Sequence, residues 1–405
     1  ITNIKDYVEN ICTKKVLSMD KHLKIVPTKS LARHKFKNIH KILKITTRTG
    51  KSLKITANNE LPILENGDIE WVKAEDLMVG NYIATPRVIN VYTQIPSILD
   101  ILDENFVKVM NDDVVKEVLS KLKNKYGSLK SVAKLLKVNY ETFKSFNRKK
   151  CIGRPNLKLF RSMVKLAGSD YQDIKNKISR ISYVDNRFNN PIPIKVPEVC
   201  EELMYTLGLL NSDGYISKAV VSFVNNDENL HQIFKRNIKA LFGLDAKRYI
   251  PAQSNVSNKT LYVLLKILEQ ISPKLPNNLI LSWLKGYVDG DGYPIINPDG
   301  TIKEIGIATA KHNEAKLVQT LLLRLGIISK IELQQPSKSI GFIDGRAVRT
   351  KKIKYNIVIR NINNIQKFSN IISFRQAERA NKLLTALKKN IEVKMRGDIM
   401  PVGNK

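Results

Sequence analysis

Two aspartates, each followed by a glycine at the end of an apolar stretch, are the first candidates for chemistry in this chain. Asp213 lies near the end of residues 206–214, and Asp291 lies near the end of residues 284–292. Each stretch has two small residues four positions apart, and such positions share one face of a helix. These small residues are Gly208 and Ser212 in the first copy and Gly286 and Gly290 in the second. The pattern predicts two helices that pack along small-residue stripes and bring both carboxylates to one end of the pair.

Neighbouring carboxylates repel one another unless a cation lies between them. Hard divalent cations such as Mg²⁺ prefer oxygen ligands, so Asp213 and Asp291 are predicted metal ligands. Gly214 and Gly292 are expected to end these helices as left-handed C-caps. In a strongly basic chain, this arrangement favours metal-assisted cleavage of a nucleic-acid backbone. Two ordinary core helices with capping glycines are the alternative.

The charge of the chain favours a polyanionic partner. Its 405 residues carry 68 Lys and Arg against 37 Asp and Glu, a formal net charge of +31. A lysine-rich proteome would also raise the charge, but residues 121–150 are especially dense in Lys and Arg. The length predicts more than one domain, and a hydrophobic content of 43% is ample for packed cores.

Cysteine, histidine and apolar patterns argue against several classes of protein. The three cysteines are far apart and form no metal or disulfide pattern, which favours a reducing cytoplasm. The five histidines include no pair at metal-ligand spacing, so neither a zinc site nor a Ser-His-Asp site is predicted. No apolar run approaches membrane-spanning length, and no signal peptide is expected.

The twinned motif resembles the duplicated motif of the LAGLIDADG homing endonucleases. The second copy is the closer match, whereas the first has Asn211 where the family usually has an earlier Asp that helps to cap and pack the helix. The resemblance implies a pseudo-two-fold αββαββα endonuclease domain over residues 191–370. It also implies that Asp213 and Asp291 hold Mg²⁺ and that each half cuts one strand. The expected partner is double-stranded DNA with a long asymmetric site, bound by a monomer.

The order of elements after each Asp-Gly is expected to repeat. The first half has a strand at 220–225 and a helix at 228–241, and the second has a strand at 304–309 and a helix at 313–325. Such a repeat predicts two sheets, each backed by helices, whose polar faces contact bases and phosphates.

A lysine near the end of each half is the remaining catalytic candidate. The resembled family usually places a Lys there, where it polarises the water or the phosphate. Strands are expected at 258–264 and 351–359, which makes Lys259 and Lys354 the predicted catalytic lysines. A phosphate contact or a merely solvated side chain remains the alternative for each.

The N-terminal part reads as short strands broken by turns, with a hairpin expected from strands 42–47 and 53–56. Residues 69–87 resemble the N-terminal half of the Hint splicing fold of archaeal inteins, which predicts a partial Hint-like module over residues 1–95. Asn59 stands where that family has a catalytic His, and no nucleophilic Cys or Ser opens the chain. The resemblance implies an archaeal, cytoplasmic intein endonuclease without working splicing ends. An unrelated small β-module is the alternative.

The segment at residues 96–190 is expected to be a helical insert that recognises DNA. Helices at 131–136 and 140–148, joined by a tight turn, have the helix-turn-helix layout whose second helix enters the major groove. Ser128 is the expected N-cap of the first helix. The predicted DNA contacts are Lys144, Asn147, Arg148, Lys149, Lys150 and Arg154. A helical spacer with a solvated basic face is the alternative.

Residues 371–405 are expected to form an amphipathic helix at 374–387 and a tail. The chain as a whole is therefore expected to be an α+β multidomain protein. Two rivals to the endonuclease share its fold: a catalytically inactive DNA-binding regulator and an RNA maturase. The pair of crowded carboxylates argues against a pure binder, and the Hint-like segment argues against a maturase.

Overall fold

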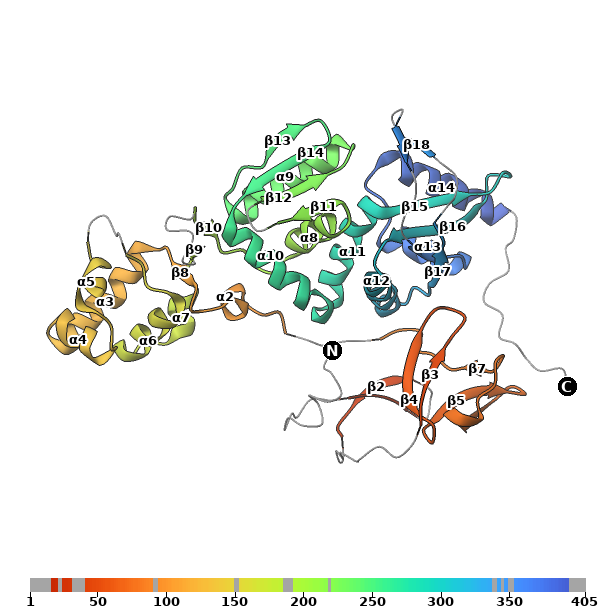
Figure 1. Cartoon of the computed structure of the whole chain (residues 1–405), viewed down its shortest axis with the longest axis horizontal. Helices are drawn as coiled ribbons and strands as arrows, with labels where there is room; N and C mark the ends of the chain where they lie inside the picture. The colour runs from red at the N-terminus through yellow and green to blue at the C-terminus, as the bar shows by residue number, and fades with distance from the viewer. Residues whose placement is uncertain are drawn as a thin grey trace. The chain divides into compact units, whose positions relative to one another are not determined.

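The protein has a mixed helix and sheet fold (Figure 1), and its residues divide into two compact units. A computed structural model describes residues 16–20, 24–30, 41–89, 94–148, 153–184, 192–217, 220–336, 341–343, 346–348 and 353–392. One unit combines residues 1–93 with residues 276–405, and the other is residues 94–275. None of the described helices has both the length and the apolar character that crossing a membrane requires.

The N-terminal strands of the first unit are β1 (Val16–Met19), β2 (Ile25–Thr28), β3 (Ile42–Thr46), β4 (Ser52–Thr56), β5 (Glu60–Glu65), β6 (Asp68–Lys73) and β7 (Tyr82–Ile83). They form two antiparallel pairs, β1-β2 and β3-β4, and a three-stranded sheet of order β6-β5-β7. The hairpin expected around Thr49-Gly50 is confirmed, because β3 pairs with β4. Gly50 has a φ of +86°, a left-handed conformation that glycine adopts easily. The carbonyl oxygen of Thr49 in this turn accepts from the backbone nitrogen of Ile331, at 3.1 Å.

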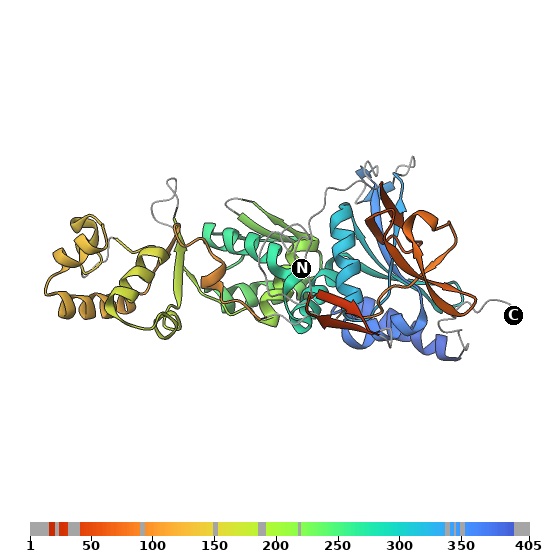
Figure 2. The same cartoon turned by 90° about the horizontal axis from the view of Figure 1, so that it is seen from below.

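The first part of the other unit is helical and includes a small sheet, seen from two sides in Figures 1 and 2. Its elements are α2 (Ile98–Ile101), β8 (Val107–Val109), α3 (Asp112–Tyr126), α4 (Leu129–Leu135), α5 (Tyr140–Ser145), α6 (Leu157–Ala167), α7 (Tyr171–Lys175), β9 (Arg180–Tyr183) and β10 (Ile194–Lys195). Ser128 caps α4 as expected, since its hydroxyl accepts from the backbone nitrogen of Ser131 at 3.1 Å. Lys137, with a φ of 54°, lies in the turn that follows. Two short helices joined by a turn are present, while their role in DNA binding stays a prediction.

The remainder of that unit is a four-stranded antiparallel sheet with three helices. Its elements are α8 (Glu201–Asp213), β11 (Gly214–Ile216), β12 (Val220–Val224), α9 (Glu228–Phe242), β13 (Lys247–Ile250), β14 (Gln253–Ser257) and α10 (Lys259–Ile271). The strand order is β11-β12-β14-β13. Val221 and Phe223 of β12 are buried, and Phe223 packs against Phe234 of α9, with ring centroids 5.3 Å apart.

The same succession of elements returns in the first unit after residue 276. It comprises α11 (Asn277–Asp291), β15 (Gly292–Ile296), β16 (Ile302–Thr309), α12 (His312–Arg324), β17 (Lys330–Gln334), β20 (Lys354–Ile359) and α13 (Ile362–Ile371). The strand order is β15-β16-β20-β17, which matches the other sheet strand for strand. A short hairpin of β18 (Gly341–Ile343) and β19 (Arg346–Val348) is inserted, and α14 (Ala377–Glu392) follows.

The structure differs from the expectations for residues 258–264 and for residues 374–387. Residues 258–264 were expected to form a strand, but α10 begins at Lys259, because the Asn258 side chain accepts from Leu261 N at 2.9 Å and caps a helix. The buried leucines of α10 follow helical spacing, and their packing outweighs the strand-favouring residues Tyr262 and Val263. The expected helix at 374–387 is α14, which begins at Ala377, and a separate helix, α13, precedes it.

Candidate functional site

The two candidate metal ligands occupy equivalent positions at the ends of helices. Asp213 is the last residue of α8 and Asp291 is the last residue of α11, and each is partly exposed. A strand begins directly after each aspartate, with Gly214 opposite Phe223 and Gly292 opposite Ile307. The internal repeat therefore holds at the level of strand register.

The glycines after the aspartates serve a different purpose from the one expected. Gly214 has a φ of −105° and Gly292 a φ of −88°, so neither is a left-handed cap. A Cβ atom at Gly214 would lie 2.2 Å from the carbonyl oxygen of Leu210, and one at Gly292 would lie 2.6 Å from that of Val288. Glycine is needed because the new strand leaves the helix against its last turn, where a side chain has no room.

Asp213 is held by a neighbour from the sheet. Its Oδ2 accepts a hydrogen bond of 2.6 Å from Nδ2 of Asn225, which directly follows β12. A hydrogen bond to a carboxylate is stronger than one between neutral groups. The orientation of the Asp213 carboxylate is therefore set by the end of β12.

The residue two positions before each of these aspartates anchors its helix. Asn211 donates from Nδ2 to Oε1 of Glu269 on α10, at 3.0 Å. Asp289 is 1% exposed and accepts from the backbone nitrogen of Arg375 at 2.7 Å. Arg379 of α14 donates to the carbonyl oxygen of Asp289, at 3.0 Å. These contacts give this position a packing role in each helix.

The small-residue stripes lie on helices as expected. Gly208 and Gly286 are buried, whereas Ser212 and Gly290 are partly exposed. The hydroxyl of Ser212 donates within its own helix, to the carbonyl oxygen of Leu209 at 3.0 Å. Because α8 and α11 belong to different units, the pairing of the stripes and the meeting of the two carboxylates stay predictions.

The predicted catalytic lysines do not occupy equivalent places. Lys354 is the exposed first residue of β20. Lys259 instead begins α10, where its Nζ lies 5.1 Å from the ring centre of Tyr262 and 5.8 Å from that of Tyr183. The expected symmetry between Lys259 and Lys354 was wrong, since it assumed a strand where α10 begins.

Strand register brings a different pair of lysines to matched positions. In the first sheet, one row of facing residues crosses the four strands in the order Lys247, Asn255, Ser222 and Tyr215. In the other sheet, the row is Lys330, Val358, Gly306 and Tyr293. The sequence carried a signal for this pair: each lysine stands four residues after a helix-ending glycine, Gly243 or Gly326.

The polar faces of the two sheets differ in chemistry. In the second sheet, Arg360 donates to Glu304 at 2.6 Å and forms two bonds to Glu332, at 2.6 and 2.7 Å. Arg360 and Lys330 together lower the pKa of Glu332 to about 2, chiefly by hydrogen bonding. In the first sheet, Gln253 Nε2 instead donates to Oδ1 of Asn255, at 3.0 Å. One face thus carries an ionic network and the other carries amides.

The predicted DNA contacts of the helical insert lie in different settings. Lys144 and Arg148 are about half exposed, at 49% and 50%, and lie 3.9 and 3.8 Å from Glu141. Asn147 is exposed. Arg154 forms an ion pair of 2.9 Å with Asp112 and is only 20% exposed, which favours a structural role. Lys149 and Lys150 lie outside the described residues.

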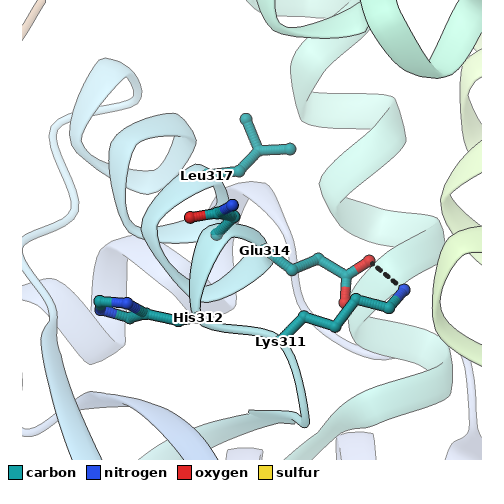
Figure 3. A pocket seen from close by; sticks show the side chains of 5 residues that line it. Lys311, His312, Glu314 and Leu317 are labelled. Atoms are coloured by element: carbon teal, nitrogen blue, oxygen red, sulfur yellow. Dashed lines mark hydrogen bonds and ion pairs between the residues drawn. The ribbon is translucent and has the colours of Figure 1, made fainter.

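An open hollow lies at the start of α12 (Figure 3). It is lined by Lys311, His312, Asn313, Glu314 and Leu317. Lys311 and Glu314 of this lining form an ion pair of 3.3 Å, and the ring of His312 stacks on Tyr355 with centroids 4.9 Å apart. The lining lacks a set of metal ligands or a nucleophile with its base.

Across the part of the chain that the structure describes, no group of three or more His, Cys, Asp or Glu is placed to hold a metal ion. A metal held by either Asp213 or Asp291 would therefore need further oxygen ligands. Carbonyl groups at a helix end and phosphate oxygens of a bound nucleic acid are such ligands. Carboxylate oxygens suit a hard divalent cation, and two of them would not make a zinc site closed by the protein alone.

One known protein family matches the second copy of the internal repeat. Residues 278–373 match a family described as LAGLIDADG-like domain. The match runs from the start of α11 to just beyond the end of α13. This part of the chain therefore resembles a LAGLIDADG-like domain, and its structure is mixed helix and sheet.

The curated relatives align with most of this chain but with only part of their own length. An A-type ATP synthase subunit of Methanopyrus kandleri is 25% identical over 299 residues, which is 71% of this chain and 28% of that protein. A probable translation initiation factor IF-2 of Methanocaldococcus jannaschii is 26% identical over 389 residues, which is 88% of this chain and 29% of that protein. The chain thus spans less than a third of either relative.

Solved structures with similarity include a homing endonuclease and the protein DUF199/WhiA. Mesophilic variants of the homing endonuclease I-DmoI align at 19% identity and a TM-score of 0.33, covering 43% of this chain and 96% of that one. The same endonuclease in complex with DNA and Mn aligns at 19% identity and a TM-score of 0.32, covering 43% and 97%. DUF199/WhiA from Thermatoga maritima aligns at 16% identity and a TM-score of 0.33, covering 50% and 65%. Identities this low transfer no residue roles to this chain.

Proposed function

We propose that this chain is a site-specific DNA endonuclease of the LAGLIDADG type, intein-encoded or intein-derived, that cuts both strands with a divalent metal. The observation that carries the proposal is the repeat itself. Two largely buried helices each end in Asp, and the Gly that follows begins a strand in a sheet of the same strand order. Two carboxylates at equivalent positions favour one strand cut for each half of the molecule.

Asp213 and Asp291 are the proposed ligands of Mg²⁺. Bound Mg²⁺ supplies a Lewis acid that lowers the pKa of water and stabilises the leaving oxygen. The protein's part is to orient the carboxylates, which Asn225 does for Asp213. The helix end before Asp291 is held by Arg379, which donates to the carbonyl oxygens of Asp289 and Gly290.

Lys247 and Lys330 are the lysines that we propose for contacts near the scissile phosphates. Their matched register supports equivalent roles in two halves that act on two strands. Lys354 remains a second proposal, as an exposed phosphate contact at the start of β20. Lys259 is the weaker candidate, because its ammonium group lies over two tyrosine rings.

The polar faces of the sheets are proposed to read a long asymmetric site in duplex DNA. Amide side chains such as Gln253 and Asn255 suit hydrogen bonds with base edges. Arg360, fixed by two carboxylates, presents a different pattern on the other sheet. Unlike faces in a single chain support recognition of two unlike half-sites by a monomer.

The intein origin rests on the pattern of relatives. Three relatives with different names each align with 71–88% of this chain through only 28–29% of their own length. They are the ATP synthase subunit of Methanopyrus kandleri and, from Methanocaldococcus jannaschii, the translation initiation factor and a glutamine–fructose-6-phosphate aminotransferase. A segment that recurs as a minor part of proteins with such different names has the distribution of an inserted element. The Hint-like sequence at residues 69–87 agrees with that origin.

The test is selection of a target followed by cleavage. A library of random duplexes is enriched for binding in Ca²⁺, and recovered sequences are then incubated with Mg²⁺. We expect double-strand cuts that Asp213→Asn and Asp291→Asn abolish while binding persists. Binding without cutting by the unaltered chain would support the inactive regulator instead. Selective binding of structured RNA over every recovered duplex would support the maturase.

A further inference from the structure

A chain of three polar residues lies behind the carboxylate of Asp213. Asn225, at the end of β12, donates to Asp213. The backbone carbonyl oxygen of Asn225 lies 2.7 Å from Nε2 of His231 on α9, and Nδ1 of the same ring lies 2.8 Å from Oγ of Ser254 on β14. His231 and Ser254 are both fully buried. Residues from a strand end, a helix and a second strand thus form one chain of hydrogen bonds behind Asp213.

The hydrogen-bond roles in this chain are set by the carbonyl group. A carbonyl oxygen only accepts, so Nε2 of His231 must carry the proton. The neutral ring then accepts at Nδ1, and the hydroxyl of Ser254 donates to it. Burial lowers the pKa of His231, which keeps the ring neutral. The charged groups that act on the ring are Arg248 on β13 and Glu228 and Lys235 on α9.

Asn225 has a partner for each of its polar groups. Its backbone nitrogen donates to Ala252 O at 2.9 Å, and its Oδ1 accepts from Asp227 N at 2.7 Å. Because Oδ1 is engaged, the amide cannot flip, and Nδ2 is directed at Asp213. An amide fixed in this way is organised before any ligand binds.

We propose that Asn225, locked by His231 and Ser254, is a positioning residue that orients the Asp213 carboxylate for its metal. This inference rests on the proposed nuclease function and deepens it. Groups that orient a metal ligand from behind typically change affinity or activity by about 10- to 100-fold when they are removed.

The second half lacks this arrangement at the matched positions. Strand register relates Asn225 to Thr309 and Ser254 to Ile357. Thr309 directs its hydroxyl to Glu314, at 2.7 Å. His231 lies three residues after the start of α9, and Ala315 lies three residues after the start of α12, so these positions match. Ala315 is buried and has no ring. Loss of the Asn225 amide should therefore affect the two strand cuts unequally.

The experiment measures each strand cut separately, under single turnover with Mg²⁺, on a duplex labelled at both ends. Asn225→Leu removes the amide at similar volume, and we expect the ratio of the two nicking rates to change by about tenfold or more. His231→Leu should shift the ratio in the same direction. His231→Gln keeps an N–H near the position of Nε2 and should restore it.

Phe234→Leu is the matched control, because Phe234 packs on Phe223 in the same core and forms none of the hydrogen bonds that link Asp213, Asn225, His231 and Ser254. It should lower thermal stability and leave the ratio of rates unchanged. An unchanged ratio in Asn225→Leu, or an equal change in Phe234→Leu, overturns the proposal.

Nuclear magnetic resonance of ¹⁵N-histidine in the whole chain gives a readout without cleavage. With five histidines in the chain, we assign His231 by its loss in His231→Gln and expect the neutral Nε2–H tautomer at pH 7. In a second sample labelled with ¹⁵N-asparagine, the side-chain amide resonance of Asn225, assigned by its loss in Asn225→Leu, should move in Asp213→Ala. An Nδ1–H tautomer or an unmoved amide overturns the positioning role even if cleavage is observed. If the spectra are as expected but no duplex is cut, the nuclease function is refuted, whereas the hydrogen bonds around Asn225 are confirmed.

Discussion

At the scale of single residues, close approach decides which side chains the helix ends can accept. Both motif glycines have extended backbones that any residue could adopt. What excludes a larger residue is the preceding helical turn, which a Cβ atom would strike. The Asp-Gly pair is therefore a single unit, in which the aspartate supplies the oxygen and the glycine lets the strand begin beside it.

Gly292→Ala should destabilise the protein by roughly 1–3 kcal/mol, the usual cost of overpacking a well-packed site. Its Cβ atom would lie 2.6 Å from Val288 O and 2.8 Å from Val288 Cγ1. Urea unfolding followed by circular dichroism measures the loss. Lys303→Ala, an exposed change on the neighbouring strand β16, serves as the control. A stability equal to that of the control would show that the helix end adapts to a side chain.

Stability should fall in mild acid because of His231. Burial lowers the pKa of His231 below the ordinary 6.5. Below that pH, the unfolded chain therefore binds a proton at His231 more readily than the folded chain does. Each such proton favours unfolding, and the free energy of unfolding should decline progressively as the pH drops from about 6.5. Urea midpoints between pH 7.5 and 5 measure this slope. His231→Gln should flatten it, and an identical slope in both proteins would rule His231 out as the cause.

At the scale of elements, strand register shows which residues occupy matched positions in the two sheets. Tyr215 and Tyr293 stand at the same place in two sheets, yet Tyr215 is 66% exposed while the ring of Tyr293 crosses Gly306, where a Cβ atom would lie 2.4 Å from it. Matched strands thus present unlike surfaces. This difference suits a molecule that reads two unlike half-sites.

The helical insert should add affinity without changing chemistry. Replacing Lys144, Arg148, Lys149 and Lys150 by Ala should weaken DNA binding and lower the salt slope by up to about three units, because each phosphate contact releases about one counterion. Fluorescence anisotropy over a range of salt concentrations measures both effects. Arg154→Ala is a useful comparison, since its ion pair with Asp112 predicts a loss of stability with little change in salt slope. An unaltered slope in the fourfold variant would make the insert a spacer.

At the scale of the whole molecule, the two sheets and their unlike faces belong to one chain. The net charge of +31 supports association with a polyanion. Because the repeat is internal, a second copy is not needed to supply a second aspartate. The proposed division of labour therefore gives one chain the tasks that two identical subunits would share.

Light scattering should give a monomer both free and bound, with one chain for each recovered target duplex. The internal repeat of strand order is the reason for this expectation. Titration by analytical ultracentrifugation in Ca²⁺ measures the stoichiometry without cleavage. Two chains on one duplex would place the functional symmetry between molecules and contradict the proposed assignment of one strand to each half.

Several features followed from the sequence because they are local. The Asp-Gly helix ends, the Ser128 cap and the Thr49-Gly50 hairpin depend on residues within a few positions of one another. Gly243, with a φ of 70°, likewise ends α9 as its position predicts. The net charge needs no structure at all.

Tertiary structure alone decided which distant residues meet. Asn225, His231 and Ser254 come from a strand end, a helix and another strand, and no spacing in the sequence links them. Strand register showed that Lys247 in one sheet and Lys330 in the other occupy equivalent rows, whereas sequence position favoured Lys259. The physical reason is the same in each case, because register and packing are set by contacts between segments far apart in the chain, and local preference yields to them.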